Sequence, residues 1–594
     1  MRTDATFLGT VNRVVGAQVD VILSPTELPS NSPIVDGRVY RLGQIGSFVR
    51  IPIGFLNVYG IVSQVGSIPG DTTEETQVAF RGQKTLQVQL VGEAYRNESF
   101  QRGLSTYPTL EDEVHVVTHE DLARIYAPSA RSCVSVGVHS ASESLPANVD
   151  LDKLVTRHCA ILGSTGSGKS NTVAAILKGL TSGSHPNTQV IVIDPHGEYH
   201  TAFSGISRVF RIDDPANPLV LPYWALSFDE LAWFLVDRRS ASESQQDSLL
   251  RDRLLEMRQA AVPTLKATTA TATGSTLSPN DITVDAPIPF DLRELWCYFD
   301  RAQRVTYEDV PRTVEALIAE GNPSTLTSAR FKPHSLGSAA PYKPLVQPMM
   351  GPYVSKMLAR IKDGRFRFLL SLGDYDGIHK DLHDLLSEWL NHEHPITVFD
   401  LAGVPPEIID IVVGLLARIV FEMSFWGRKL PGMGKQRPML MVFEEAHSYL
   451  PSGEAKFVQG YARRAVQRIL KEGRKYAVGA MVVSQRPSEL DETILSQCGT
   501  FFALRLTNSQ DQSRVKSTVP DDLAGLTNLL PALRTGEALV VGDAMQIPSR
   551  IRVDLVEPRP ESTDPPIAAR WREQREPTPD YAAAVTAWRH QKQA

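Results

Sequence analysis

The chain has 594 residues, of which 42% are hydrophobic and 22% are charged, and its formal net charge is −6. A chain of this length exceeds what one hydrophobic core usually supports, so about two to four domains are expected. The acidic balance excludes a general cationic coat for nucleic acid, but it leaves room for a local basic channel.

The cysteines and the apolar runs indicate in which cellular compartment the protein is expected. Cys133, Cys159, Cys297 and Cys498 are scattered and form no CxxC pair, so neither a disulfide framework nor a zinc site is expected. The first residues contain no long apolar stretch, so no secretory signal is expected there. No run approaches the roughly 18 apolar residues that suggest a membrane span. We therefore expect a cytoplasmic protein that does not use a membrane.

Residues 1–148 are expected to form a small β-barrel. Short stretches such as "TFLGTVNRVV", "GSFVRIPIG" and "KTLQVQLVGEAY" are rich in Val, Ile and aromatic residues and alternate partly with polar ones. Gly, Pro, Asn and Asp interrupt them at intervals typical of hairpins. Short antiparallel strands of this kind commonly close into a barrel.

A different pattern occupies residues 149–225 and 391–556. The buried strand "HCAILGS", the helix "NTVAAILKGL" and the buried strand "TQVIVIDPHGEY" follow one another. Strand, helix and strand in this order predict a parallel α/β sheet. Five further strand candidates come later: "PITVFDLAGVP", "RPMLMVFEEAH", "AVGAMVVSQRP", "GTFFALRL" and "GEALVVGD".

Residues 226–390 interrupt this pattern and predict a helical insertion. Segments such as "SFDELAWFLV" and "PRTVEALIAEG" have the apolar spacing of helices. The stretches 263–289 and 322–348 are rich in Thr, Ser, Ala and Pro, and we expect exposed loops there.

The C-terminal tail, residues 557–594, is polar and rich in Pro. Its apolar residues Trp571, Tyr581 and Trp588 have little core of their own. We expect the tail to pack on the α/β core or on a neighbouring subunit.

The segment "GSTGSGKS", Gly163 to Ser170, lies between a predicted strand and a predicted helix and fits the pattern GxxxxGK[ST]. Glycines in such a loop let backbone N–H groups face phosphates. Lys169 is predicted to bridge the β- and γ-phosphates of ATP, and Ser170 to ligate Mg²⁺. The alternative is a Gly/Ser turn that only resembles a phosphate loop. The predicted nucleotide-binding residues are Gly163, Ser164, Thr165, Gly166, Ser167, Gly168, Lys169, Ser170 and Asn171.

An acidic pair ends the apolar run Met439–Phe443. Glu444 is predicted to hold the Mg²⁺ through a water molecule. Glu445 is predicted to orient or deprotonate the attacking water. The alternative is an acid pair that opens a helix near the positive end of its dipole.

Two other strand ends carry polar candidates. Asp194 and Glu198, in "DPHGEY", are candidates to approach the metal, the water or an adjacent subunit's site, and the alternative is a capped turn. Gln485, in "VVSQRP", is a candidate sensor of the γ-phosphate, and the alternative is a surface polar residue.

Arginines are candidates for a finger that stabilises charge in a neighbour's site. Arg157 precedes the P-loop strand, and Arg474 lies beside a glycine in "EGRKYAVG", which makes it the strongest single candidate. The alternative for each is the solvated face of an amphipathic helix. A second basic cluster at 360–368 is a candidate DNA contact, although a solvated surface is favoured there.

Together these elements predict an α/β P-loop NTPase with a RecA-like (ASCE) parallel sheet, an N-terminal small β-barrel and a helical insertion. The chain resembles the HerA family of hexameric ATPases and DNA translocases, relatives of FtsK. The resemblance rests on "GSTGSGKSNTV", "VIDPHGEY", "LPYWALSFDEL", "FDLAGVP", "VFEEAH", "EGRKYAVG" and "SQRPSEL", which occur in the family's order. The stretches "GSFVRIP" and "YGIVSQVG" look like the family's HAS barrel.

The resemblance implies a ring of six subunits with Mg²⁺–ATP at the interfaces and double-stranded DNA in the central pore. Family members work with a partner, either the NurA nuclease in DNA end processing, or a sirtuin-like NAD-consuming protein or another nuclease in antiphage defence. The HAS barrel is the expected dock for such an effector. The residues that match family motifs are Gly168, Lys169, Ser170, Glu445, Asp194, Gln485, Arg157 and Arg474, and one of the two arginines is expected to act in trans.

Three functions stay open at this point. The sequence favours an ATP-driven motor on double-stranded DNA. The alternatives are a hexameric ATPase scaffold that assembles an effector with little translocation, and a switch that does not need DNA. A simple GTPase is disfavoured because no guanine-reading NKxD motif is evident.

Overall fold

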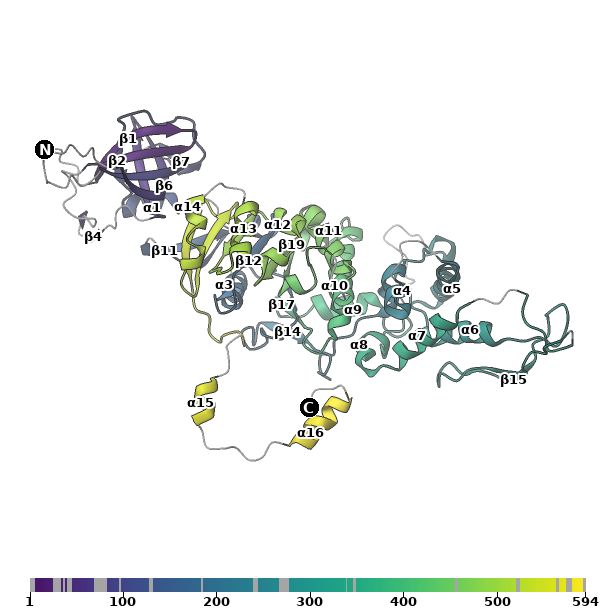
Figure 1. The fold of residues 1–594 in the computed structure, drawn as a ribbon. Helices are drawn as coiled ribbons and strands as arrows, with labels where there is room; N and C mark the ends of the chain where they lie inside the picture. Colours follow the sequence, from purple (N-terminus) through teal and green to yellow (C-terminus); the bar gives the residue numbers. More distant parts are fainter. Residues whose placement is uncertain are drawn as a thin grey trace, which may run out of the picture. The chain divides into compact units, whose positions relative to one another are not determined.

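The fold was examined in a computed structural model (Figure 1). Contacts divide the chain into two compact units, which are residues 1–207, 421–455 and 466–564, and residues 208–420, 456–465 and 565–594. The structure describes residues 6–24, 34–35, 38–39, 45–68, 83–95, 98–127, 132–140, 142–182, 185–238, 244–266, 277–337, 339–345, 349–453, 458–519, 524–561, 566–572 and 580–590.

The first unit begins with an antiparallel β-barrel, which confirms the predicted N-terminal domain. The strand order is β2-β1-β9-β5-β6-β7, and pairing of β2 with β7 closes the barrel. Alternate residues such as Val19 and Val21 point inward and are fully buried in its core. The strands are β1 (Phe7–Val15), β2 (Gln18–Leu23), β5 (Phe48–Ile53), β6 (Leu56–Ile68), β7 (Gln83–Tyr95) and β9 (Glu113–Val116).

Smaller elements flank the barrel. Helix α1 (His119–Ile125) begins at Thr118, whose side chain and that of Asp121 form a capping box. The others are the paired β3 (Ile34–Val35) and β4 (Arg38–Val39), and β8 (Gln101–Arg102) beside β7.

The predicted barrel boundary at residue 148 is too late. Strands β10 (Cys133–His139) and β11 (Ser142–Asp150) pair with each other, and β10 pairs with β22 (Ser549–Val553) near the end of the chain. Both therefore extend the sheet of the ATPase core. A half-buried strand has the same alternation in either sheet, so composition gave no signal for the change.

The core sheet of the first unit has the predicted ASCE arrangement. Five parallel strands lie in the order β20-β12-β19-β18-β13, so β19 separates the P-loop strand β12 from β18, which leads into Glu444. Their residues are buried on both faces, as near-continuous apolar runs predict. The strands are β12 (Cys159–Leu162), β13 (Val190–Asp194), β18 (Met439–Phe443), β19 (Val478–Ser484) and β20 (Thr500–Ala503).

Antiparallel strands and helices complete this part of the chain. β21 (Glu537–Gly542) joins β20 to β22. The helices are α2 (Leu151–Thr156), α3 (Lys169–Thr181), α10 (Ile409–Trp426), α11 (Tyr461–Tyr476), α12 (Glu492–Ser496), α13 (Ser509–Thr518) and α14 (Ala524–Thr527), of which α10 and α11 each begin in residues of the second unit.

The second unit is mainly helical, as predicted for the insertion. Its helices are α4 (Phe228–Val236), α5 (Gln245–Ala261), α6 (Leu292–Arg304), α7 (Gly351–Lys362), α8 (Arg367–Leu370) and α9 (Leu382–Leu390). Short strands accompany them: β14 (Ser207–Phe210) beside β17 (Ile396–Asp400), and β15 (Leu317–Ala319) beside β16 (Arg330–Phe331). Of the two predicted loops, residues 267–276 lie outside the described residues, and the second contains β16.

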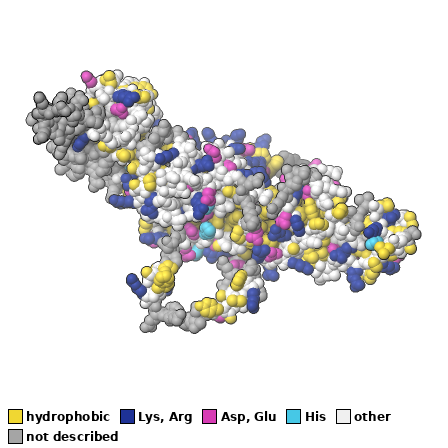
Figure 2. Space-filling model, in the orientation of Figure 1, with side chains coloured by type: hydrophobic (Ala, Val, Ile, Leu, Met, Phe, Trp, Pro, Cys, Tyr) yellow, Lys and Arg dark blue, Asp and Glu magenta, His cyan; other side chains and the backbone are white. Residues whose placement is uncertain are grey.

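Two short helices form the described part of the tail, α15 (Ile567–Arg572) and α16 (Tyr581–His590). Trp571 and Trp588 are 84% and 74% exposed, and Figure 2 shows hydrophobic side chains on the surface of both helices. Within one chain these rings join no core, so packing of the tail on another surface stays a prediction. Among the described residues, no helix combines the length and apolar character that crossing a membrane requires.

Candidate nucleotide-binding site

The loop between β12 and α3 needs glycine at three positions. Gly166 and Gly168 have φ values of 71° and 104°, in the left-handed region that glycine adopts without strain. A Cβ atom on Gly163 would lie 2.6 Å from Oγ of Ser167. The loop therefore has the tight curvature that points backbone N–H groups toward a bound phosphate.

Neighbouring segments hold this loop in place. The N–H of Ser164 donates to the carbonyl of Arg505 over 2.9 Å, and the N–H of Gly536 donates to the carbonyl of Ser167 over 2.9 Å. The side chain of Asn171 donates to the carbonyl of Asp554 over 2.9 Å. Asn171 was predicted to bind nucleotide, and here its side chain fastens α3 to the segment after β22.

Lys169 and Ser170 begin α3 at the mouth of the loop. The Lys169 side chain is buried, and burial lowers its pKa, although the carboxylates of Glu445, Glu444 and Glu198 act in the opposite direction. A buried ammonium gains from a close anion, which suits a phosphate at this loop. The hydroxyl of Ser170 donates to Oε2 of Glu198 over 3.0 Å, so a hydroxyl and a carboxylate already meet here.

Glu444 is a buried carboxyl group at the end of β18. Its pKa is raised to about 8, mainly by burial and also by the nearby carboxylates of Asp194, Glu445 and Glu198, while a hydrogen bond from Tyr199 acts in the opposite direction. At neutral pH the group therefore holds a proton unless a cation lies close by. Such a carboxyl group fits a site that a divalent cation occupies together with the nucleotide.

Glu445 follows directly, with φ 47° and ψ 41°. Its Oε2 lies 3.2 Å from Nδ1 of His447, although the two atoms are not in hydrogen-bond geometry. Burial lowers the pKa of His447, partly opposed by Glu445. The same Nδ1 lies 3.4 Å from Oγ of Ser484, at the end of β19. The carboxylate of Glu445 thus keeps an oxygen available to accept a proton.

Gln485 lies at the same edge of the sheet, directly after β19. Its Oε1 accepts a hydrogen bond from Oγ1 of Thr165 in the P-loop over 2.6 Å. The structure therefore brings the predicted sensor beside the loop that is predicted to hold the phosphates.

Asp194 ends β13 and is buried within a turn. Its carboxylate accepts hydrogen bonds from the N–H groups of His196, Gly197 and Tyr199, over 3.2, 2.9 and 3.1 Å. This geometry is the capped turn that the sequence left open as the alternative, and a direct catalytic role of Asp194 stays a prediction.

The two candidate arginines lie away from this cluster. Arg474, in the last turn of α11, lines a cavity of about 700 Å³ together with residues where β13, β18 and β19 begin. Arg157 precedes β12 and forms an ion pair with Asp543. The P-loop, Glu445 and Gln485 follow the opposite ends of these strands. Neither arginine therefore joins the other site residues within one chain.

Besides Glu198, two residues that the sequence interpretation gave no role, Tyr199 and His447, belong to the cluster. Glu198 contacts Ser170, Tyr199 contacts Glu444, and His447 contacts Glu445. Each stands within or next to a motif that the sequence did single out, "DPHGEY" or "FEEAH". Adjacency to a predicted site residue at a strand end was therefore the available signal.

This arrangement supplies what phosphoryl transfer to water requires. It combines an N–H-rich loop, a buried ammonium, a hydroxyl for a cation and a carboxylate with an available oxygen. Among the described residues, no three His, Cys, Asp or Glu side chains form a metal site by themselves. Mg²⁺ in nucleotide sites is commonly held by one or two protein groups together with phosphates, which the Ser170 hydroxyl and the Glu444 carboxyl suit.

Comparison with family models gave two adjoining matches. The model described as "Helicase HerA, central domain" matches residues 134–420, and the model described as "Helicase HerA-like C-terminal" matches residues 418–584. The first match begins at β10, as the large sheet does, and not in the barrel.

Curated relatives agree with this result. The chain is 25% identical over 475 residues to the DNA double-strand break repair helicase HerA of Sulfurisphaera tokodaii, covering 80% of this chain and 79% of the relative. It is 27% identical over 438 residues to the protein of the same name from Pyrococcus furiosus, covering 71% and 69%. Among solved structures, the conjugative coupling protein TrwB is similar at 14% identity and a TM-score of 0.41, covering 76% of this chain and 94% of TrwB.

Proposed function

Because the chain belongs to the HerA family of helicases and ATPases, we propose that it is an ATP-driven motor that translocates along double-stranded DNA. One observation carries the proposal. Lys169 of the P-loop lies within electrostatic reach of the acidic pair Glu444 and Glu445, and Ser170 beside it donates to Glu198, at a single edge of the sheet. The curated relatives with the same domain models are named as DNA repair helicases, which supports DNA as the track.

ATP and Mg²⁺ fit the residues at this edge. The P-loop N–H groups and Lys169 would hold the β- and γ-phosphates. The hydroxyl of Ser170 would ligate Mg²⁺ directly, and the carboxyl group of Glu444 would hold it through water. Bound Mg²⁺ neutralises phosphate charge as it develops during transfer. Glu444 gives up its proton as positive charge enters the site.

The reaction that we propose is hydrolysis of the γ-phosphate. Glu445 accepts the proton of the attacking water, and His447 holds the Glu445 carboxylate in position. Gln485 accepts a hydrogen bond from Thr165 and contacts the γ-phosphate. When the γ-phosphate leaves, Gln485 shifts and moves the end of β19. Motion of these strand ends would couple turnover to movement of the track.

The placement of Arg474 supports a ring with nucleotide at the subunit interfaces. The five residues of β18 alone span about 17 Å. Arg474 lies at the edge where such strands begin, so it reaches a γ-phosphate only from another copy. We propose that Arg474 acts in trans, that Arg157 supports its own subunit through Asp543, and that the ring is a homohexamer with DNA in its pore.

We further propose that the barrel docks an effector, such as a NurA-like nuclease, a sirtuin-like NAD-consuming protein or another nuclease. Phe55, in the turn between β5 and β6, is 75% exposed, and Tyr95, paired with the neighbouring Leu56, is 53% exposed. Two exposed aromatic rings so close together suit a protein interface. The role that we propose is DNA end processing or antiphage defence.

Displacement of a triplex-forming strand tests translocation directly. A motor should strip a fluorescent third strand from linear duplex DNA only when ATP is hydrolysed, and Lys169→Ala should be inactive. ATP turnover without displacement, rising only with an effector, would replace the motor with the scaffold function. A Ser513→Ala variant, whose exposed hydroxyl donates to the carbonyl of Ser509 within α13 over 2.8 Å, is a suitable surface control.

A further inference from the structure

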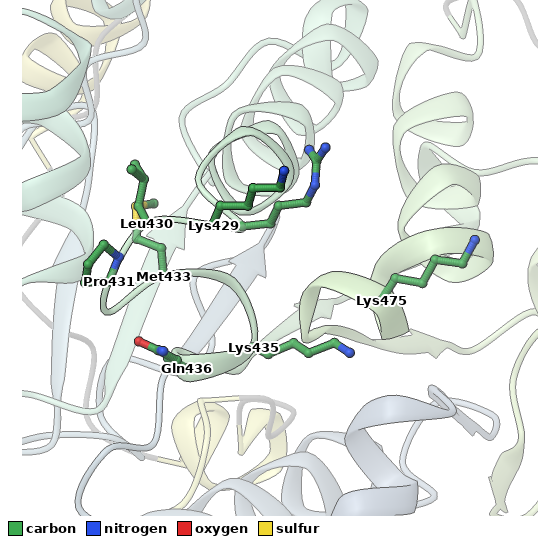
Figure 3. A pocket seen from close by; sticks show the side chains of 8 residues that line it. Lys429, Leu430, Pro431, Met433, Lys435, Gln436 and Lys475 are labelled. Carbon is green, nitrogen blue, oxygen red and sulfur yellow. The ribbon is translucent and has the colours of Figure 1, made fainter. Parts of the chain in front are cut away.

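A pocket lined by basic side chains lies on the first unit, outside the nucleotide site. It has a volume of about 460 Å³. We call it the cationic pocket, and its lining residues are Arg428, Lys429, Leu430, Pro431, Met433, Lys435, Gln436 and Lys475. Figure 3 shows Lys429 and Lys435 on the loop after α10, and Lys475 at the end of a helix across from them.

The loop that carries most of these residues is held by its own hydrogen bonds. Gly432 and Gly434 have φ values of 71° and 57°, which turn the chain back on itself. The N–H of Gly432 donates to Oε1 of Gln436 over 2.7 Å. The pocket is therefore built before any ligand arrives, which reduces the entropy that binding must overcome.

Within the described part of the chain, no carboxylate neutralises the basic side chains of the pocket. Among the described residues, Lys429, Lys435 and Lys475 make no ion pair, and no carboxylate lines the pocket. Arg428 donates to the carbonyl of Phe425 over 2.9 Å and stacks on its ring. Four like charges in one pocket repel one another, on a chain whose net charge is −6. An anionic ligand removes that repulsion.

The remaining lining narrows the class of anion. None of the described lining residues is aromatic, so none can stack on a base, and none carries a carboxylate that could accept from a ribose hydroxyl. A mononucleotide would leave its base and sugar without partners. Backbone phosphates need only cations, and contacts of that kind are independent of base sequence.

The pocket is also separate from the P-loop. Its loop precedes β18 and Lys475 precedes β19, whereas the acidic pair and Gln485 follow those strands. Phosphates at the P-loop therefore lie about one strand length, roughly 17 Å, from the pocket. The cationic pocket is thus a second anion site on the same subunit.

We propose that the cationic pocket binds backbone phosphates of double-stranded DNA. The inference rests on the proposed function, since it names where the track is held. The pocket provides a chain of acidic composition with a local binding site for a polyanion. Contacts at this site must break and re-form as the DNA moves. Lysine suits this purpose because its ammonium group contacts a phosphate without fixed geometry.

The salt dependence of DNA binding tests the proposal. Equilibrium binding of a short fluorescent duplex is measured by anisotropy between ~50 and 200 mM salt, with a non-hydrolysable ATP analogue. Log K falls linearly as log salt rises, and each lost phosphate contact reduces the magnitude of this slope by about 0.9. Lys429→Gln/Lys435→Gln should lower the slope by about 1.8 and weaken binding at least about 10-fold at low salt. Lys475→Gln, from the other segment, should lower it by about 0.9.

The controls separate the possible failures. Lys343→Gln/Lys516→Gln removes two exposed charges elsewhere and should keep the wild-type slope. The midpoint of thermal unfolding should be unchanged in every variant, which verifies folding. If the pocket variants keep the wild-type slope, the pocket does not bind DNA, and the proposed motor function is unaffected by that result. A wild-type chain that binds no duplex would overturn the proposed function along with it.

Discussion

Glu445 of the acidic pair lies against His447, with Oε2 of Glu445 3.2 Å from Nδ1 of His447. His447 in turn lies 3.4 Å from Oγ of Ser484, the last residue of β19. The next residue, Gln485, accepts a hydrogen bond from Thr165 of the P-loop. The ends of β18 and β19 thus meet at one imidazole, and Gln485 extends the link to the P-loop. We therefore expect His447 to position Glu445.

Replacing His447 should therefore slow hydrolysis without weakening nucleotide binding. We expect His447→Ala to lower kcat about 10-fold, because the carboxylate loses its fixed orientation, with KM for ATP unchanged. His447→Gln should recover part of the loss. Steady-state kinetics across a pH series checks this, with His379→Ala, an exposed histidine of the helical unit, as the control. Equal loss from both variants would contradict the positioning role.

The buried carboxyl group of Glu444 predicts a pH-dependent stability. Its pKa is about 8 in the folded chain and near 4.5 when exposed. Between about pH 5 and pH 8 the folded state thus holds a proton that the unfolded state has released, so the free energy of unfolding falls as pH rises. Glu444→Gln removes this contribution, and its Tm should decline less than that of the wild type across the window.

Nucleotide binding should release the proton that the Glu444 carboxyl group holds in the folded chain. Near pH 7, a non-hydrolysable ATP analogue with Mg²⁺ should release about one proton per site from Glu444, measured by calorimetry in buffers of different ionisation enthalpy. Glu444→Gln should release about one proton fewer. The exposed variant Glu393→Gln should behave as the wild type does. Identical proton release in Glu444→Gln and the wild type would show that this carboxyl group is already ionised.

Placement of Arg474 at the far edge of the sheet predicts complementation between subunits. Arg474→Ala and Lys169→Ala should each be nearly inactive alone. A mixture of the two should recover part of the turnover, because some interfaces then pair an intact P-loop with an intact arginine. Lys471→Ala, one turn earlier on the same exposed surface of α11, is the matched control. A mixture that remains as inactive as its components would argue against action in trans.

The carboxylate of Asp194 should contribute mainly to the stability of the fold and less to catalysis. It accepts from three buried or half-buried N–H groups, and leaving buried donors without a partner costs about 1–3 kcal/mol each. We expect Asp194→Ala to lower the free energy of unfolding by about 2–4 kcal/mol, measured by denaturant titration. Asp214→Ala, which removes a comparable exposed cap, should cost far less. A stable but inactive Asp194→Ala would instead favour the catalytic role.

Local sequence patterns were sufficient to predict the parts of the fold that depend on local chemistry. The run Cys159–Leu162 and the turn after it indicate a buried strand and a phosphate loop, because the glycine and apolar positions are each required there. The acidic pair was located because a strand end is visible as the end of an apolar run. Parallel strands place their carboxyl ends at one edge, so the meeting of these residues followed.

Features that depend on long-range pairing were not predictable in this way. The strand β10 joins β22, more than four hundred residues later in the sequence, and nothing in its alternation distinguishes it from a barrel strand. The cap at Asp194 was left open because the same "DPHGEY" pattern suits a turn and a catalytic acid. The cationic pocket could not be predicted because its lysines come from two segments that only the tertiary fold brings together.

ATP hydrolysis with and without linear duplex DNA tests the central claim most directly. We expect the purified chain to hydrolyse ATP several-fold faster when the duplex is added. Glu445→Gln should lower both rates by about 10²- to 10⁴-fold, while nucleotide binding is retained. Turnover that is indifferent to DNA, or that survives in Glu445→Gln, would contradict an ATP-driven DNA motor that uses Glu445 as its base.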